Sequence, residues 1–418
     1  MHSTRISTSR RAALGLLLAA GMSTVAARPA AARDTGVGSG AVDDEDTVVR
    51  WYEATSRAIA AAGTPLTPVI DSATWAIAWL AAARAVRRSP SEVARRAAVA
   101  TAVHDALVAR LPSQTAALET ELTRSLDALP AGAARQAGVE AGRAEAARLL
   151  ADRAGDGLDE ASINIPWSPP PPADGVWRPT PPAHAPAIQA GQGRARPFLL
   201  RDVTRFRPGP PPAVGSRTFL DDLAEVRAVG SADSHTRTEQ QTVTARIWAQ
   251  GTLTAYTQVL RHAVADLTRP LHTRVALLAV FHTASVDTQI VCQEAKYFYA
   301  YWRPVTALHT RGETDWAPLI PTPPHPEYPS GHACFAGAAG AVLTTVLGAR
   351  APQPFTLTNS FFPGLVSRAY TDWRQLTQDT VDARVWAGVH YRNTDTISAA
   401  LGREVAAHHL ADLPHLFS

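Results

Sequence analysis

Apolar residues recur at helical spacing along most of this 418-residue chain, and this pattern predicts a largely helical protein. The N-terminal half contains several such segments, separated by short polar connections. The predicted helices there cover residues 46–62, 72–86, 89–111, 113–129 and 133–154. Because short loops between amphipathic helices favour a bundle, we expect an N-terminal helical region over residues 46–160.

A change of composition interrupts the helical pattern in the middle of the chain. Residues 165–215 hold many of the 32 prolines, among them the run from Pro169 to Pro172. Proline lacks an amide hydrogen and clashes with the preceding helical turn, so this stretch cannot form regular helix. We expect it to wrap over the bundle and to border the mouth of the active site.

Helical periodicity resumes at about Phe219 and continues almost to the C-terminus. The predicted helices in this part cover residues 236–250, 252–266, 272–301, 332–348, 367–376, 380–389 and 398–410. A second proline-rich connection occupies residues 304–329, and no segment is predicted to form a sheet. The predicted fold class is all-α: helical bundles with long proline-rich connections, including a C-terminal helical region over residues 219–415.

The first 32 residues resemble a signal peptide rather than a part of the fold. Arg10 and Arg11 precede an apolar run from Ala12 to Ala20, and an Ala-x-Ala site ends at Ala32. Paired arginines before a short apolar run are typical of twin-arginine export. We therefore expect a secreted or periplasmic protein. A general secretory signal would change the route and not the destination.

Composition and charge argue against several classes of protein. The net charge is only +3, and the 40 basic residues are dispersed among 37 acidic ones, so no basic run suggests nucleic acid. No later stretch of uninterrupted apolar residues is long enough for a predicted membrane span. Two cysteines, Cys292 and Cys334, are too few for an all-cysteine zinc site. They either pair in an oxidising compartment or stay free and buried.

The stretch Pro329-Ser330-Gly331-His332 combines three kinds of hydrogen-bonding group at one point. Ser330 is a favourable N-cap for the apolar helix that follows, and a helix N-terminus exposes unpaired amides that attract anions. The stretch therefore predicts an oxyanion site made of amides, a hydroxyl and the His332 imidazole. A capped core helix with an incidental histidine is the simpler explanation, and the neighbouring motifs decide between the two.

Two further stretches supply cations and a second histidine. Lys296, the only lysine, and Arg303 are seven residues apart, which places them on one face of a predicted helix. Arg384 and His390 are six residues apart, and they converge only if their helix ends or bends near Gly388. Three cations suit a tetrahedral oxyanion with several negative oxygens, because ammonium and guanidinium groups donate charge-assisted hydrogen bonds.

The motifs Lys-x6-Arg-Pro, Pro-Ser-Gly-His and Arg-x5-His occur in this order over residues 296–395. Together they resemble the superfamily of vanadium-dependent haloperoxidases and type 2 phosphatidic-acid-phosphatase-like acid phosphatases. The helical N-terminal half is similar to that of secreted bacterial haloperoxidase-like proteins. The resemblance implies a vanadate cofactor, with phosphate as the alternative occupant, and the oxidation of halide by hydrogen peroxide to hypohalous acid. It also implies a small organic molecule as the halogen acceptor. A homodimer is the oligomeric state that we consider for the protein.

The resemblance implies a role for each residue of the three motifs. Five groups would hold the oxyanion: Lys296, Arg303, Ser330, the Gly331 amide and Arg384. His390 would be the axial vanadium ligand, or the nucleophile in a phosphatase, and His332 would transfer protons.

Several positions bear on how closely the chain follows the family. Ala383 stands where the family often has Ser, and Thr394 stands where it often has Asp. Asp395 is one residue further, and it would orient His390 only if the turn shifts. His325 occupies a position where bromide-using members carry His and chloride-using members carry Phe, which favours bromide. A solvent-exposed loop histidine is the alternative for His325.

Haloperoxidases and phosphatases share this oxyanion chemistry because vanadate mimics phosphate in shape and charge. The size of the chain, its predicted export and its helical N-terminal half favour a vanadate-dependent haloperoxidase. A soluble secreted acid phosphatase that works through a phosphohistidine is the alternative. A non-catalytic oxyanion-binding protein is the second alternative, and the changes at Ala383 and Thr394 leave it open.

Overall fold

Helices dominate the computed structural model, which describes residues 46–63, 68–360 and 364–418. With 62% helix and 6% strand, the predicted all-α class is confirmed. The predicted signal peptide, residues 1–32, lies outside the described residues. The first α-helices are α2 (Thr47–Ala61), α3 (Pro68–Arg87), α4 (Glu92–Arg110), α5 (Thr115–Asp127), α6 (Ala133–Asp152) and α7 (Glu160–Ile163). The next are α8 (Arg217–Val229), α9 (Glu239–Ile247), α10 (Thr252–Val264) and α11 (Leu271–Tyr299). The last are α12 (Pro304–Thr310), α13 (Gly331–Leu347), α14 (Trp373–Trp386), α15 (Arg392–Ala411) and α16 (Leu413–Leu416).

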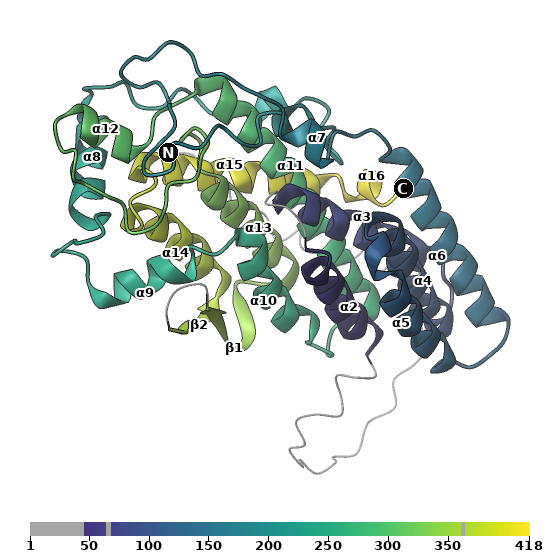
Figure 1. Cartoon of the computed structure of the whole chain (residues 1–418). Helices are drawn as coiled ribbons and strands as arrows, with labels where there is room; N and C mark the ends of the chain where they lie inside the picture. The colour runs from purple at the N-terminus through teal and green to yellow at the C-terminus, as the bar shows by residue number, and fades with distance from the viewer. Residues whose placement is uncertain (1–45, 64–67, 361–363) are drawn as a thin grey trace.

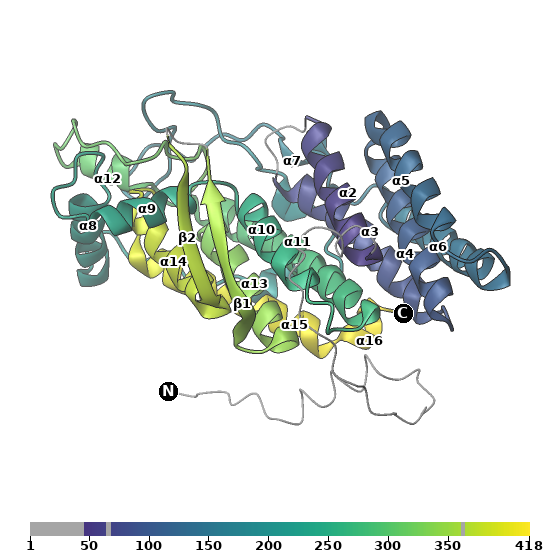
Figure 2. The same cartoon turned by 90° about the horizontal axis from the view of Figure 1, so that it is seen from below.

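The N-terminal helices begin where side-chain caps satisfy their first amides. Asp46 accepts hydrogen bonds from the amides of Val48 and Val49, both at 3.0 Å, and so starts α2. Ser91 accepts the amide of Ala94 at 3.2 Å and starts α4. Helices α4 and α6 pack closely because Gly138 has no side chain at their contact. A Cβ at this position would collide with the α4 backbone. The N-terminal helices form the purple and blue end of the molecule in Figures 1 and 2.

Helix α11 runs through the centre and joins the two halves of the chain (Figure 2). It packs against α3 on the N-terminal side and against α13 on the C-terminal side. By length and composition alone, α3 and α11 are apolar enough to cross a membrane. Within the fold, however, 83% and 94% of their most apolar stretches are buried. Their hydrophobicity is explained by their position in the core, since a helix that is apolar on all sides needs neighbours all round.

A two-stranded antiparallel hairpin, β1 (Arg350–Asn359) and β2 (Val366–Asp372), separates α13 from α14. The predicted helix over residues 367–376 is therefore wrong in its first half. Phe355 and Leu357 are buried and alternate with more exposed positions, which is the period of a strand. Tyr370 packs against Phe355 and accepts a hydrogen bond from Trp248 Nε1 at 3.1 Å. These cross-strand and core contacts decide the local conformation.

The proline-rich segment contains no α-helix between residues 164 and 216, as predicted, and it contacts α11. Short 3-10 turns occur at Gln192–Arg194 and Val203–Phe206, as one does at Pro112–Gln114 ahead of α5. Asp287 of α11 accepts the amides of three consecutive residues, Phe198, Leu199 and Leu200, at 2.6, 2.9 and 3.2 Å. Further along, Tyr328 donates its hydroxyl to the carbonyl of Gly209 at 2.6 Å. The segment therefore contacts the loop that leads into α13.

Helices α13 and α15 lie unusually close together because glycines face the partner helix. A Cβ at Gly337 would overlap the carbonyl oxygen of Ala399, and one at Gly402 would overlap that of Cys334. This close packing sets the first turn of α13 against the middle of α15. Because the third predicted motif ends just before α15 begins, the packing of the two helices brings two of the motifs near each other.

Candidate oxyanion site

The ends of four helices bring the predicted site residues together. Lys296 lies in the last turn of α11, Arg303 is the N-cap of α12, and Ser330 is the N-cap of α13. The expectation that Lys296 and Arg303 share one helix face is wrong. Helix α11 ends at Tyr299, because Ala300 adopts a left-handed conformation with φ of 46°. The break lets Arg303 turn back toward Lys296.

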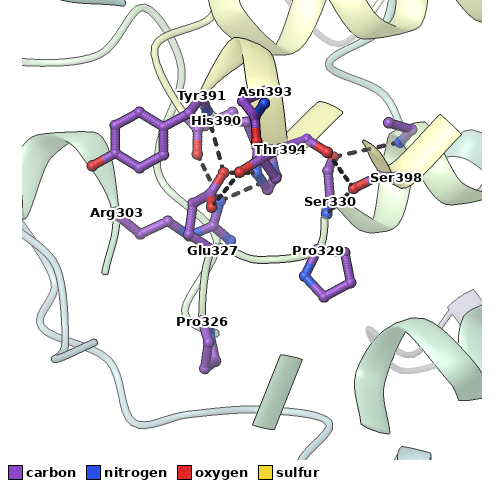
Figure 3. A network of polar contacts seen from close by, with 12 residues as sticks. Arg303, Pro326, Glu327, Pro329, Ser330, His390, Tyr391, Asn393, Thr394 and Ser398 are labelled. Atoms are coloured by element: carbon purple, nitrogen blue, oxygen red, sulfur yellow. Dashed lines mark hydrogen bonds and ion pairs between the residues drawn. The ribbon is translucent and has the colours of Figure 1, made fainter. Parts of the chain in front are cut away.

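The predicted start of α13 is confirmed. Ser330 is buried, and its hydroxyl accepts the amide of Ala333 at 3.4 Å. Its own amide donates to the Ser398 hydroxyl of α15 at 2.7 Å, which ties the two helix ends together (Figure 3). Gly331 is the first helical residue, and amides at that position have no acceptor within the helix. The local sequence thus leaves backbone donors at the site.

Arg384 and His390 converge because the chain breaks between them, as the sequence required. Helix α14 ends at Trp386, and Gly388 follows with φ of 80°. A side chain at Gly388 would be strained by this conformation and would also collide with the Gly230 carbonyl. The turn places His390 just before α15, on the same side as Arg384.

The three cations are buried side by side. The Lys296 ammonium donates hydrogen bonds to the carbonyl of Glu327 at 3.1 Å and to the carbonyl of Pro329. Arg303 donates to the carbonyl of Val389 at 2.8 Å. Arg384 donates to the carbonyl of Trp248 at 3.3 Å, and its Nε has no hydrogen-bond partner within the described part of the chain.

Burial lowers the pKa of all three cations. The pKa of Lys296 falls from 10.5 to about 8, and Arg303 repels it further. The pKa values of Arg303 and Arg384 fall from the usual arginine value to about 10, again mainly through burial. Removing charges from water is costly unless opposite charge accompanies them. A bound oxyanion would supply that charge and would give the unpartnered Arg384 Nε an acceptor, so the residues present fit vanadate or phosphate.

The site histidines are held neutral. Burial is the largest cause in each case, and the neighbouring cations add to it, so the pKa values of His325, His332 and His390 lie well below the usual value. His390 is only 2% exposed, and its Nε2 lies 3.2 Å from Arg303 Nη1. His332 is half-buried, with Nε2 3.3 Å from the carbonyl of Gln250. Neutral rings can accept protons or offer a lone pair.

His325 belongs to the site and is not a freely exposed loop residue. It is half-buried, and its Nδ1 lies 3.0 Å from Arg303 Nη2. Its carbonyl accepts Arg303 Nε at 3.0 Å. His325 therefore fixes the guanidinium plane of Arg303 from one side.

One site residue, Glu327, was missed from the sequence. Its carboxylate is fully buried between His390 and Thr394 (Figure 3). Oε1 lies 2.7 Å from His390 Nδ1, and Oε2 accepts the Thr394 hydroxyl at 3.0 Å. Burial raises the pKa of Glu327 from 4.5 to about 7, although Arg303 and Lys296 lower it. Its sequence signal was an acidic residue just before a buried helix cap.

Asp395 does not orient His390, a question that the sequence left open, because Glu327 occupies the Nδ1 side of the ring. Asp395 is the fourth residue of α15 and is fully buried there. Neither of its carboxyl oxygens has a hydrogen-bond partner among the residues that the structure describes. Burial raises its pKa well above the usual value, while the nearby Ser330 hydroxyl and Arg384 guanidinium act the other way. Asp395 is thus adjacent to the site on the Ser330 side.

Both cysteines are free and buried, which decides between the two predicted states. Cys292 lies one turn before Lys296, and its Sγ is 3.5 Å from the carbonyl of Pro329. Cys334 lies one turn after Ser330 and packs in the same apolar cluster as Cys292. The two thiols therefore belong to an apolar cluster that packs next to the site.

A pocket of about 500 Å³ lies on the His332 side of the site. It is lined by small and uncharged polar residues: Ala249, Gln250, Gly251, Thr254, Gln258, Thr358, Asn359 and Ser360. Gln250 joins it to the site, because the Gln250 carbonyl contacts His332. Over the described ranges, no group of three or more His, Cys, Asp and Glu side chains could hold a metal cation.

Comparison with known proteins finds one family model and several similar folds. Residues 276–418 match the family model of the VCPO second helical-bundle domain. The fold is similar to the crystal structure of a bacterial vanadium-dependent iodoperoxidase, with a TM-score of 0.69 and 20% identity over 91% of this chain and 98% of that one. No curated protein sequence matches the chain.

Two further similar structures are forms of a bacterial vanadium-dependent chloroperoxidase. The holo form has a TM-score of 0.67 and 18% identity over 90% of this chain and 99% of that chain. The apo form has a TM-score of 0.64 and 17% identity over 84% and 94%. Residues 276–418 thus match the VCPO second helical-bundle domain, and the chain as a whole has the fold of these bacterial vanadium-dependent peroxidases.

Proposed function

We propose that the protein is a vanadate-dependent haloperoxidase that oxidises halide, preferably bromide, with hydrogen peroxide to hypohalous acid. The observation that carries this proposal is the arrangement of three buried cations around the Nε2 of a neutral histidine, His390. Bound vanadate would act there as a Lewis acid that activates hydrogen peroxide for attack by halide.

The residues of the chain have separate tasks in this proposal. Lys296, Arg303 and Arg384 hold the oxygens of the oxyanion, together with the Ser330 hydroxyl and the Gly331 amide. His390 would hold the bound oxyanion through the lone pair of its Nε2. The reaction of halide with hydrogen peroxide consumes one proton and releases water with each hypohalous acid. His332, with its lowered pKa, exchanges that proton at the mouth of the site.

Other features support the finer points of the proposal. His325 beside Arg303 supports bromide as the preferred halide. The uncharged pocket next to His332 has room for a small organic acceptor. The paired Arg10 and Arg11 support export by the twin-arginine route to a secreted or periplasmic location. Substituting both by lysine and fractionating cells expressing the full chain tests that export.

The test is reconstitution of the purified protein with orthovanadate. Bromination of monochlorodimedone with hydrogen peroxide and bromide is expected, and elemental analysis should find vanadium bound. His390→Ala should lose bromination, whereas His408→Ala, an exposed position on α15, should retain it. Bromination that survives in His390→Ala would overturn the assigned site.

The same protein preparation distinguishes the alternative activities. A phosphatase would hydrolyse p-nitrophenyl phosphate, would be inhibited by vanadate, and would fail to brominate. A protein that binds phosphate and shows neither activity would be a non-catalytic oxyanion binder. Either result would contradict the proposed haloperoxidase activity while leaving the oxyanion site in place.

A further inference from the structure

Glu327 connects two of the groups that would hold the oxyanion. Its backbone carbonyl accepts the Lys296 ammonium at 3.1 Å, and its amide donates to the Tyr301 carbonyl at 2.8 Å. Its carboxylate meets His390 at 2.7 Å. A single fully buried residue therefore contacts a cation through its main chain and the histidine through its side chain.

The carboxylate is itself fixed from two further directions. Oε1 also accepts the amide of Tyr391 at 3.2 Å, and Oε2 accepts the hydroxyl of Thr394 at 3.0 Å. Both donors belong to the start of α15, as Figure 3 shows. The side chain of Glu327 cannot move without breaking these bonds, so its position relative to the imidazole ring is well determined.

These contacts permit only one tautomer of a neutral His390. A carboxylate accepts hydrogen bonds and a guanidinium only donates them. The ring hydrogen must therefore lie on Nδ1, toward Glu327, and the lone pair must lie on Nε2, toward Arg303. In the opposite tautomer, the Nδ1 lone pair would face the Glu327 carboxylate, which is another acceptor. The Nε2 hydrogen would then face the Arg303 guanidinium, which is another donor.

We propose that Glu327 is the positioning residue of His390, holding the Nδ1-protonated tautomer so that the Nε2 lone pair faces the oxyanion. Thr394 and the Tyr391 amide orient Glu327 in turn. The carboxylate reaches His390 from the loop before α13, and not from α15. The inference rests on the proposed function only for the identity of the bound oxyanion. The tautomer is a property of the protein alone.

The competing explanation is that Glu327 serves only as a buried counter-charge for Lys296 and Arg303. Two substitutions separate the explanations. Glu327→Gln removes the charge and keeps a carbonyl oxygen that can accept from Nδ1, while the new amide can donate to the Thr394 hydroxyl. Glu327→Leu removes both the charge and the acceptor at similar size.

The direct measurement is the tautomer of His390, read from its ¹⁵N chemical shifts in protein labelled at histidine. The signals are assigned by their loss in His390→Gln. Wild type and Glu327→Gln should show the hydrogen on Nδ1. Glu327→Leu should lose this pattern, with the hydrogen moving partly to Nε2. Glu294→Gln is the matched control, because Glu294 pairs with Arg207 outside the site.

Thr394 provides a second route if Glu327→Leu fails to fold. Thr394→Val removes one bond to the carboxylate and keeps the shape of the side chain, so it should broaden or shift the Nδ1 signal of His390. Adding Thr394→Asp to Glu327→Ala should restore the wild-type tautomer, since the Thr394 hydroxyl is only 3.0 Å from the native carboxylate oxygen.

Inorganic phosphate and orthovanadate report the consequence for binding. Calorimetric titration should show the affinity for both falling at least about tenfold in Glu327→Leu and recovering in the Thr394→Asp double variant. An unchanged His390 tautomer in Glu327→Leu, or a loss of that tautomer in Glu327→Gln, would overturn the positioning role. If wild type binds neither anion, the proposed function fails while the tautomer result still stands.

Discussion

The buried ammonium of Lys296 gives a quantitative test of the site. Its pKa falls from 10.5 to about 8 in the folded protein, mainly because burial disfavours the charged form. At ~1.4 kcal/mol per pH unit, this change corresponds to about 3 kcal/mol. Below the lower pKa, both folded and unfolded chains carry the charge, and the cost of burial is fully present.

The direction of the effect follows from proton binding. Between the two pKa values, the unfolded chain binds more protons at Lys296 than the folded chain does. The free energy of unfolding should therefore rise with pH through this window. Lys296→Met has no group to titrate, so the wild type should gain about 3 kcal/mol relative to the variant as pH increases from below 8 to above 10.5.

The assay is urea unfolding of both proteins across this pH range in buffer free of phosphate and vanadate. Lys296→Leu is the control, since it also has no group to titrate and should behave like Lys296→Met at every pH. Saturating phosphate should diminish the rise, because a neighbouring anion stabilises the charged ammonium. A difference between wild type and Lys296→Met that stays constant with pH would refute the claim that a buried charge is held here.

Three further predictions concern packing, halide choice and the proline-rich segment. Gly402→Ala should destabilise the protein by ~1–3 kcal/mol and weaken phosphate binding, because the added Cβ overlaps the α13 backbone. The measurements are thermal unfolding and phosphate titration. Gly251→Ala is the control, because its Cβ would meet its nearest neighbour only at 3.7 Å. His325→Phe removes the partner of Arg303 Nη2, so the rate of bromide oxidation should fall by about tenfold relative to the rate of chloride oxidation. An unchanged ratio of the two rates would exclude His325 from halide selection. Asp287→Ala should cost several kcal/mol and expose residues 164–216 to limited proteolysis, since three amides, two of them fully buried, lose their acceptor. A wild-type digestion pattern would contradict this anchoring role.

Local sequence predicted most of the helices because helix periodicity and caps act over a few residues. Ser330 starts a helix as predicted, Asp46 and Ser91 cap helices close to the predicted starts at 46 and 89, and the proline-rich segment is irregular as expected. The hairpin was missed because Tyr370 and Phe355 are ordered by contacts across the strands and with Trp248. Such contacts join residues far apart in the chain, and local propensity does not reveal them.

The sequence by itself determined which chemical groups the site contains: the cations, the two histidines of the motifs, and the helix start at Ser330. Only the tertiary structure decided how they meet. The left-handed Ala300 brings Arg303 back to Lys296, and the turn at Gly388 brings His390 to Arg303. The partner of His390 was likewise decided in three dimensions. Glu327 is sixty-three positions away from His390, and two buried polar groups that far apart are matched by packing and not by spacing.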